Sequence, residues 1–224
     1  MRISEDELGQ GSEQWLAWRR LGIGGSEIYA LACSADSFAE AWDMPELARL
    51  KPRGVMPSWV TDPNVLAMRK LGLMPEQPSN FHMRRGKRLE PEARSAAAER
   101  YGMEFPPFCL SPDNLPAVRV SLDGFNDKHG MLIEIKAPAK PWTHTPDYLE
   151  YQTAYQVEAL RLEAGDAHLV RTVKGLTIRE TGGPRGPVEV RAWRLDLWRD
   201  RGFCQALTKL AAEFYRRCVE QVGI

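Results

Sequence analysis

Two short stretches in the middle of the chain alternate apolar and polar residues with a period of two, the pattern of a β-strand. They are residues 118–123 and residues 131–136. The first strand is expected to end at Asp123, with Gly124 starting a turn, and Glu134 and Lys136 project from one side of the second. An ideal hairpin would set Asp123 opposite Met131, roughly 10 Å from Glu134 at ~3.3 Å per residue. The strands must therefore splay, or the loop fold back, for the two carboxylates to meet.

Capping residues and helical spacing predict the other elements. Helices are expected over 13–20, 27–32, 63–71 and 147–164, and from residue 196 onward, with Ser12 and Ser26 as N-caps of the first two. Another helix ends near residue 101 and either begins at Glu90 with Pro91 in its first turn or is kinked there. Further strands are expected over 167–173 and 188–193, with a turn at 182–187 between them. Mixed helices and strands in 224 residues indicate a single α/β domain spanning 1–224.

Composition narrows the class of protein. The 30 basic and 30 acidic residues give a formal net charge of zero, so a nucleic-acid partner would need a local basic patch. The densest one comprises Arg84, Arg85, Lys87 and Arg88, which could follow a phosphate backbone or form a solvated helix face. No apolar run approaches the ~20 residues of a membrane span, and the N-terminus has no signal-peptide core. We therefore expect a cytoplasmic protein without a membrane partner.

The predicted second strand carries the first candidate chemistry. Asp123, Glu134 and a main-chain carbonyl would suit Mg²⁺ or Mn²⁺, and Lys136 beside them could position or deprotonate a water. The alternative is that Glu134 and Lys136 lie on the solvated face of an antiparallel sheet. The apolar residues on both sides of Glu134 favour the first interpretation, since charges in such a run are costly unless paired or metal-bound. Glu90 could face inward as a third acid.

A second candidate site precedes the strands. Gly24-Gly25-Ser26 leads into a predicted helix, where free N–H groups can bind an anion, and Arg19 could add a bidentate contact to phosphate. The alternative is a capped helix pair with a surface arginine. On the helix at 147–164, Gln152 and Gln156 share a face at four-residue spacing, an arrangement that is often only structural.

Five motifs, in this order, resemble the phage lambda exonuclease and YqaJ-type viral recombinase group of the PD-(D/E)xK nuclease superfamily. They are Trp15-x-x-x-Arg19-x-x-x-Ile23-Gly-Gly-Ser26-Glu-Ile, Gly86-Lys-x-Leu-Glu90-Pro-Glu-Ala-Arg94, Ser121-x-Asp123-Gly124, Glu134-Ile-Lys136-Ala-Pro138, and the glutamine-bearing stretch from Tyr148 to Gly165. The resemblance implies a central mixed β-sheet flanked by helices. The second of the family's paired glutamines appears here as Glu158, and the segment between Ser26 and Gly86 matches poorly, which leaves DNA-channel residues there unassigned.

The resemblance also implies a role for each matched residue. Asp123, Glu134 and the carbonyl of Ile135 would bind Mg²⁺, with Mn²⁺ as a substitute and Glu90 helping directly or through water. Lys136 would orient and activate the attacking water. Gln156 would hold the lysine or the water, with Gln152 as the alternative. Arg19, Ser26 and Ser121 would form the pocket for a 5′-terminal phosphate.

The activity implied by the resemblance is that of an alkaline-type deoxyribonuclease. It would digest the 5′-ended strand of linear duplex DNA, release 5′-mononucleotides and leave 3′ single-stranded tails for recombination. Family membership further implies a homotrimer, a single-strand annealing protein as partner, and a phage or prophage origin in a bacterial host. The alternatives are a PD-(D/E)xK endonuclease and a non-catalytic protein that binds DNA ends.

Overall fold

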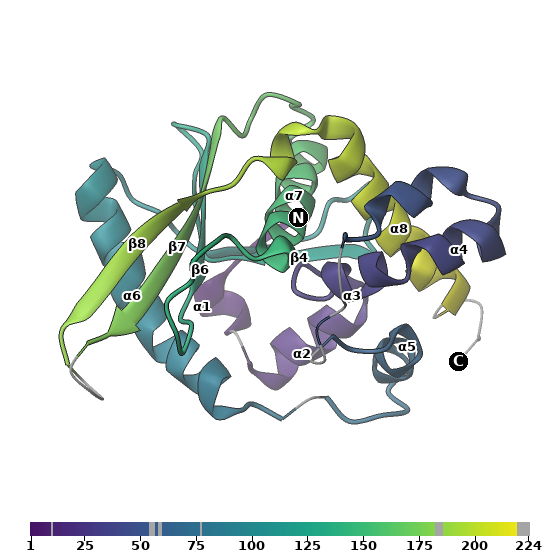
Figure 1. The fold of residues 1–224 in the computed structure, drawn as a ribbon, viewed down its shortest axis with the longest axis horizontal. Helices are drawn as coiled ribbons and strands as arrows, with labels where there is room; N and C mark the ends of the chain where they lie inside the picture. The colour runs from purple at the N-terminus through teal and green to yellow at the C-terminus, as the bar shows by residue number, and fades with distance from the viewer. Residues whose placement is uncertain (10, 54–56, 58–59, 77, 182–185, 219–224) are drawn as a thin grey trace.

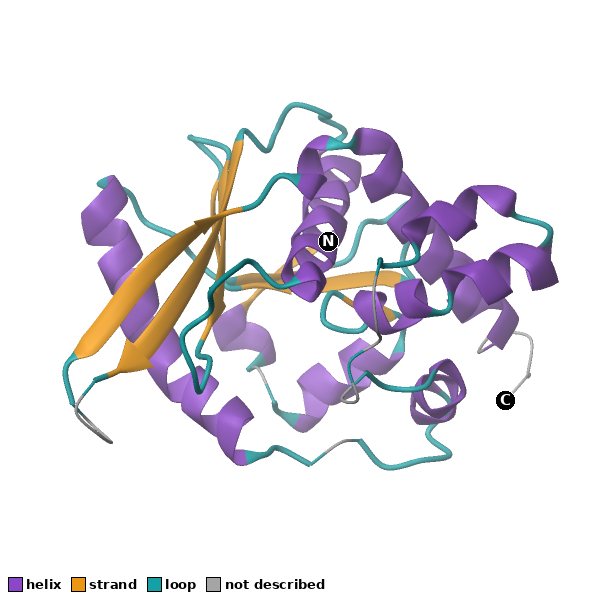
Figure 2. Cartoon of the chain, viewed as in Figure 1, coloured by secondary structure: helices purple, strands orange, loops and turns teal. Residues whose placement is uncertain are grey.

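The described residues form two four-stranded sheets flanked by helices (Figure 1, Figure 2). The computed structural model describes residues 1–9, 11–53, 57, 60–76, 78–181 and 186–218. The first sheet has the order β1-β3-β4-β2, formed by Arg2–Ser4, Phe108–Leu110, Val118–Leu122 and Ile23–Gly24. The second has the order β5-β6-β7-β8, formed by Gly124–Asn126, Met131–Lys136, Thr172–Glu180 and Val188–Arg194. Both sheets contain parallel and antiparallel pairs, so the predicted mixed α/β class is confirmed.

The helices vary widely in length. The α-helices are α1 (Glu5–Leu8), α2 (Glu13–Arg20), α3 (Ile28–Cys33), α4 (Ala35–Trp42), α5 (Pro63–Lys70), α6 (Phe81–Tyr101), α7 (Asp147–Ala164) and α8 (Arg201–Cys218). Two 3₁₀ helices, η1 (Pro45–Leu50) and η2 (Leu197–Arg199), complete the set. None of the described helices has the length and apolar character needed to cross a lipid bilayer.

Strand β6 is covered on both faces, which explains its apolar residues on either side of Glu134. Helix α6 packs on one face, where Leu89 and Ala93 join the cluster that contains Ile133. Helix α7 follows β6 in the chain and packs on the other face, where Leu132 belongs to the main core. It connects β6 to the parallel strand β7 in a βαβ unit. The two glutamines predicted on this helix are therefore carried toward the strand that bears Glu134.

Several helix boundaries confirm the predictions. Helix α2 begins after Ser12, whose side chain accepts a hydrogen bond from the N–H of Trp15, and α5 begins at Pro63 after Asp62. Helix α7 ends at Gly165, which has a φ of 65°. Ser26, however, does not cap α3. The N-cap position is Glu27, and the Ser26 hydroxyl accepts a hydrogen bond from Arg19 instead.

Helix α6 corrects the prediction made around Glu90. It is a 21-residue helix that begins after Asn80, so Glu90 lies near its middle and Pro91 lies inside it. The Asn80 side chain accepts a hydrogen bond of 2.9 Å from the N–H of Met83 and caps the helix. Packing of Leu89, Ala93 and Ala97 against the sheet outweighs the hydrogen bond that Pro91 cannot donate.

Strand positions also differ from the predictions. The strand expected over 167–173 lies at 172–180, and Gly124 does not start a turn but begins β5. The final helix is preceded by η2 and begins at Arg201 rather than Asp196. In the turn predicted at 182–187, residues 182–185 lie outside the described residues.

Candidate active site

Asp123 lies where the chain passes from the first sheet into the second. Strand β4 ends at Leu122 and β5 begins at Gly124, which pairs with Ile133 of β6. The predicted pairing of Asp123 with Met131 is therefore wrong, because β5 continues the chain for three residues and shortens the loop. One carboxylate oxygen of Asp123 accepts a 2.6 Å hydrogen bond from the N–H of Ile135, the residue between Glu134 and Lys136. The two acids meet without splayed strands.

The Glu134 carboxylate is only 1% exposed, and it receives three side-chain donors. Oε1 accepts hydrogen bonds from the Lys136 ammonium and from Gln152 Nε2, the latter at 2.6 Å. Oε2 accepts one from Gln156 Nε2 at 2.7 Å. The structure thus brings both candidate glutamines to the acid rather than to the lysine, and these donors offset the cost of burying its charge.

Burial and crowding of charge shape the electrostatics of this group. Burial is the main cause that raises the pKa of Asp123 well above its usual value, and the neighbouring Glu134 raises it further. Burial alone would lower the pKa of Lys136, but Glu134 and Asp123 outweigh it, so its pKa is raised and the amine is an ammonium at neutral pH. Two carboxylates in one buried site favour a cation between them.

Glu90 approaches Asp123 from helix α6. It forms an ion pair with Arg94, whose Nε donates a 2.8 Å hydrogen bond to the main-chain oxygen of Asp123. A small pocket lies beside them, lined by Glu90, Pro107, Phe108, Cys109, Ser121, Leu122 and Asp123. Arg94 belongs to one of the sequence motifs, but its link to Asp123 had no signal in the sequence.

The residues present fit a hard divalent cation through a small set of oxygen donors. No three described His, Cys, Asp or Glu side chains are arranged to hold a metal ion. The oxygen donors that could hold a cation are the Asp123 and Glu134 carboxylates and the carbonyl of Ile135. Glu90 lines the small pocket beside Asp123. Burial, and then repulsion from Glu134, raise the pKa of Asp123, and a cation there would relieve the repulsion.

The three residues expected to bind an anion gather around the indole of Trp15. Arg19 Nη2 donates a 2.9 Å hydrogen bond to the Ser26 hydroxyl, and its guanidinium lies 4.9 Å from the centre of the Trp15 ring. The Trp15 Nε1–H donates to the Ser121 hydroxyl at 3.3 Å. Trp15 belongs to the first sequence motif, which predicts no role for it, and it is this side chain that links Arg19 to Ser121.

The loop at residues 24–26 joins this group to the buried acids. A side chain added at Gly25 would place its Cβ 3.5 Å from Gln152 Cγ and 3.7 Å from Gln156 Cγ, the glutamines that hold Glu134. Gln156 Nε2 also lies 3.3 Å from the main-chain oxygen of Ser121 and donates to it. The candidate anion site and the candidate metal site are therefore direct neighbours.

Two further charged residues, Glu27 and Lys70, contact Arg19 of the candidate anion site. The Glu27 carboxylate forms a 3.1 Å ion pair with Arg19 and contacts Lys70, which comes from α5. Burial opposes ionisation of Glu27, but Lys70 and Arg19 outweigh it and lower its pKa to about 2. No motif or spacing in the sequence links Lys70 to this site, since the pair forms only when the fold brings the end of α5 to the residue that precedes α3.

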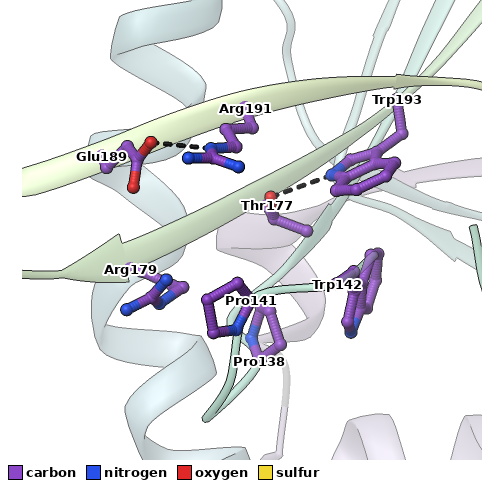
Figure 3. A pocket seen from close by; sticks show the side chains of 8 residues that line it. All are labelled: Pro138, Pro141, Trp142, Thr177, Arg179, Glu189, Arg191 and Trp193. Carbon is purple, nitrogen blue, oxygen red and sulfur yellow. Dashed lines mark hydrogen bonds and ion pairs between the residues drawn. The ribbon is translucent and has the colours of Figure 1, made fainter. Parts of the chain in front are cut away.

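The face of the sheet that bears Lys136 continues across β7 and β8. Lys136 pairs with Thr177, and Thr177 pairs with Arg191. Figure 3 shows the pocket on this face, between the strands and the loop that follows Lys136, lined by Pro138, Pro141, Trp142, Thr177, Arg179, Glu189, Arg191 and Trp193. The Trp193 Nε1–H donates a 3.0 Å hydrogen bond to Thr177, and Arg191 forms an ion pair with Glu189.

The predicted basic patch is partly neutralised. It lies on helix α6, where Arg85 and Arg88 both form ion pairs with Glu180 at the end of β7. Arg85 also donates to the main-chain oxygens of Ala137 and Pro138, just beyond Lys136. Arg85 therefore fastens the loop after Lys136 to α6, and Arg88 ties the same helix to β7.

Comparison with known proteins gives a family and a fold. The model of the YqaJ-like viral recombinase domain matches residues 14–157, a range that contains all the residues predicted from the sequence for the metal, catalytic and phosphate sites. No curated protein sequence matches the chain. The fold is similar to that of an alkaline exonuclease (LHK-Exo) from Laribacter hongkongensis, with 18% identity, a TM-score of 0.54, and coverage of 94% of this chain and 96% of that one.

Two further solved structures resemble the chain. LHK-Exo in complex with dAMP has 19% identity and a TM-score of 0.51, with 94% of this chain and 96% of that one covered. A phage related exonuclease from Haemophilus somnus 129PT has 10% identity and a TM-score of 0.54, with 91% and 97% covered. At these identities the likeness establishes the shared fold, while the family model spans more than half of the sequence. The chain therefore belongs to the YqaJ-like viral recombinase family.

Proposed function

We propose that this protein is a Mg²⁺-dependent 5′-to-3′ exonuclease that acts on linear double-stranded DNA. It releases 5′-mononucleotides and leaves 3′ single-stranded tails for phage-type recombination. The observation that carries the proposal is the meeting of Asp123, Glu134 and Lys136 next to the group formed by Arg19 and Ser26. The likeness of the fold to structures described as exonucleases, one of them solved with dAMP, supports it.

The metal site comes from strand β6 and the junction before it. Asp123, Glu134 and the carbonyl of Ile135 would hold Mg²⁺ or Mn²⁺, with Glu90 helping directly or through water. When bound, the ion supplies Lewis-acid chemistry: it lowers the pKa of the attacking water and neutralises charge that develops on the phosphate. Gln152 and Gln156 hold the Glu134 carboxylate in a fixed orientation.

Lys136 acts in this mechanism as a cation. Burial lowers the pKa of Lys136, but in the metal-free protein Glu134 and Asp123 outweigh it, so the pKa is raised and the amine is protonated. As an ammonium it would orient the attacking water and stabilise negative charge on the phosphate. The sequence hypothesis left open whether Lys136 positions or deprotonates the water.

The polarity of digestion follows from the anion site. Arg19, Ser26 and Ser121 hold the 5′-terminal phosphate, and the next phosphodiester then lies over the buried carboxylates. A strand that presents a 3′ end has no terminal phosphate to place there. Ends, rather than internal bonds, are therefore the substrate.

The assembly and partners in this proposal rest on the family. Three copies of the chain form a ring around the duplex, which keeps the enzyme on its substrate, and a single-strand annealing protein receives the 3′ tail. The protein acts in the cytoplasm of a bacterial host that carries the phage or prophage.

The decisive test is digestion of a linear duplex that carries a 5′-phosphate at one end only. With Mg²⁺, the wild-type protein should release mononucleotides from the phosphorylated end, and Lys136→Ala should reduce the rate by about 10³-fold while DNA binding persists. Lys140→Ala, an exposed lysine in the following loop, is the matched control and should behave as wild type.

Other results of the same assay would replace the proposal. Cleavage of covalently closed circular DNA would identify an endonuclease on this fold. Binding of DNA ends without release of nucleotides would identify a non-catalytic end-binding protein. A fully active Lys136→Ala variant would overturn the mechanism.

A further inference from the structure

Lys70 is a buried cation at the back of the anion site. Its side chain is 4% exposed, and its ammonium has three oxygen acceptors. Two are the carboxylate oxygens of Glu27, at 3.0 and 2.8 Å, and the third is the main-chain oxygen of Arg19, at 3.0 Å. An ammonium has three protons, so Lys70 is saturated and has none left for a ligand.

The Glu27 carboxylate has further partners besides Lys70. Its carboxylate accepts a 2.6 Å hydrogen bond from the N–H of Gly24 and contacts Nη2 of Arg19 at 3.1 Å. A Cβ at Gly24 would lie 3.1 Å from a Glu27 oxygen and 3.2 Å from Arg19, so this loop tolerates no side chain there without a shift. The carboxylate therefore fixes both the loop and one corner of the guanidinium.

Arg19 keeps donors available on its other corner. Nη2 serves Ser26 and Glu27, whereas no described residue accepts a hydrogen bond from Nη1. The guanidinium lies on Trp15, which restricts its rotation, and its side chain is 25% exposed. An anion that enters from solvent would meet these open donors.

The net charge of the group formed by Arg19, Glu27 and Lys70 depends on Lys70. Arg19 and Glu27 alone would sum to zero, and an arginine beside an uncompensated carboxylate is already paired. Lys70 brings the sum to one positive charge without touching the ligand itself. This extra positive charge matters most for the binding of a terminal phosphate monoester, which carries more negative charge than an internal diester.

We infer that Lys70 and Glu27 form a positioning pair that sets the preference of Arg19 for a 5′-phosphorylated end over a 5′-hydroxyl end. This inference rests on the proposed function and concerns its specificity. Lys70 neutralises the Glu27 carboxylate, which contacts only Nη2 of Arg19, so that Nη1 of Arg19 can bind the phosphate. Without Lys70, Glu27 would compete with the substrate for Arg19.

Because the inference depends on the net charge of Arg19, Glu27 and Lys70, a second substitution that restores this charge should restore the preference. We would measure kcat/KM on duplexes that differ only in a 5′-phosphate or a 5′-hydroxyl. Lys70→Met should lower the ratio of kcat/KM for the 5′-phosphate duplex to kcat/KM for the 5′-hydroxyl duplex by about tenfold. This is the effect of losing one charge-assisted hydrogen bond from Arg19 to the phosphate, because Glu27 would then compete for Arg19. The double variant Lys70→Met with Glu27→Gln again has one positive charge, on Arg19, and should recover most of the ratio.

The matched control is Lys51→Met, which removes a lysine from the exposed ion pair with Asp36 and should leave the ratio unchanged. A purely structural role for Lys70 would lower the melting temperature of Lys70→Met and leave the phosphate-to-hydroxyl ratio at its wild-type value, which would overturn the inference. If Lys70→Met does not fold, the double variant provides the test. A phosphate-to-hydroxyl ratio far below that of the wild-type protein would contradict the inference that the net charge of the group sets the preference.

A second readout separates this inference from the proposed exonuclease activity. Binding of the two duplexes would be measured with Ca²⁺ in place of Mg²⁺, a condition that needs no cleavage. A wild-type protein that prefers the phosphorylated end but never cleaves it would defeat the proposed function and leave the inference standing. A protein that cleaves but shows no loss of preference in Lys70→Met would defeat the inference alone.

Discussion

Glu134 shows how single side chains determine this site. Its two oxygens are not equivalent, because Oε1 has two donors, Lys136 and Gln152, whereas Gln156 is the one described side chain that donates to Oε2. A buried carboxylate oxygen that loses its last donor carries the full desolvation cost, about 1–3 kcal/mol. The two glutamines, though four residues apart on one helix face, should therefore differ in importance.

This difference can be measured in the metal-free protein. We expect Gln156→Met to lower the free energy of unfolding by about 1–3 kcal/mol and Gln152→Met by less, since Lys136 still serves Oε1. Methionine keeps the volume of the side chain, so no cavity forms, although Gln156→Met also loses the longer 3.3 Å hydrogen bond to the main-chain oxygen of Ser121. Urea denaturation of the two variants is the measurement, and equal losses would show that the donors are interchangeable.

Asp123 gives a prediction for pH. Burial, and then the repulsion from Glu134, raise its pKa above the usual 3.8, so the folded metal-free protein holds this proton more tightly than the unfolded chain. The resulting stability is complete below pH 3.8 and is lost as the pH rises through the raised pKa. In the proposed function a divalent cation would take the place of the proton, so its stabilising effect should grow over the same range.

The shift in melting temperature on adding Mg²⁺, followed across pH, tests this coupling. We expect the shift to increase with pH in the wild-type protein and to be small at every pH in Asp123→Asn, which cannot ionise. A Mg²⁺ shift independent of pH would mean that Asp123 is not a ligand.

At the residue scale, sequence alone recovered the groups that lie on regular elements. The period of two placed Glu134 and Lys136 on one face, and the spacing of four placed Gln152 and Gln156 on another. Lys70 and Glu27 are 43 positions apart and meet only in the folded chain, and the sequence has no periodic signal for such a contact.

At the scale of elements, the junction between β4 and β5 sets the distance between the two acids. Gly124 is confined there, since a Cβ would lie 2.7 Å from Cβ of Phe105 and 3.0 Å from Cγ1 of Ile133. Gly124→Ala must push β5 away from β6 or from Phe105. We expect a loss of about 1–3 kcal/mol in stability and weaker Mg²⁺ binding, because Asp123 is the adjacent residue.

Gly86 provides the control for that substitution. It lies inside helix α6, has no atom within 4 Å of its added Cβ, and has no positive φ. Gly86→Ala should therefore stabilise the protein by about 0.5–1 kcal/mol through helix propensity. Calorimetric melting of both variants is the measurement, and a Gly124→Ala protein as stable as wild type would refute the packing argument.

The elements that sequence misplaced were those governed by tertiary contacts. Pro91 and the residue before it disfavour helix locally, yet α6 runs through both because its apolar face covers the sheet. The expected turn at Gly124 is a strand because β6 offers it a partner. Periodicity detects neither effect, since both depend on residues distant in the chain.

At the scale of the whole molecule, the balance of charge limits how the protein can stay on DNA. Its 30 basic and 30 acidic residues cancel, and two members of its densest basic patch are paired with Glu180. In the proposed function, the group formed by Arg19, Ser26 and Ser121 would hold only the terminal phosphate of the digested strand. Contacts of this kind are weakened by salt and give short residence on the duplex.

Processive digestion by such a neutral chain would therefore need enclosure of the duplex, the role that the proposed ring of three copies would fill. Heparin added before the DNA should block digestion, because it competes for the first encounter. Heparin added after loading, together with Mg²⁺, should leave digestion of each bound molecule almost unchanged over hundreds of nucleotides. Product lengths on a gel measure this, with the mass of the assembly determined in parallel by light scattering. Digestion that stops at once on adding the trap, from a protein of monomer mass, would show that electrostatic contact alone holds the substrate.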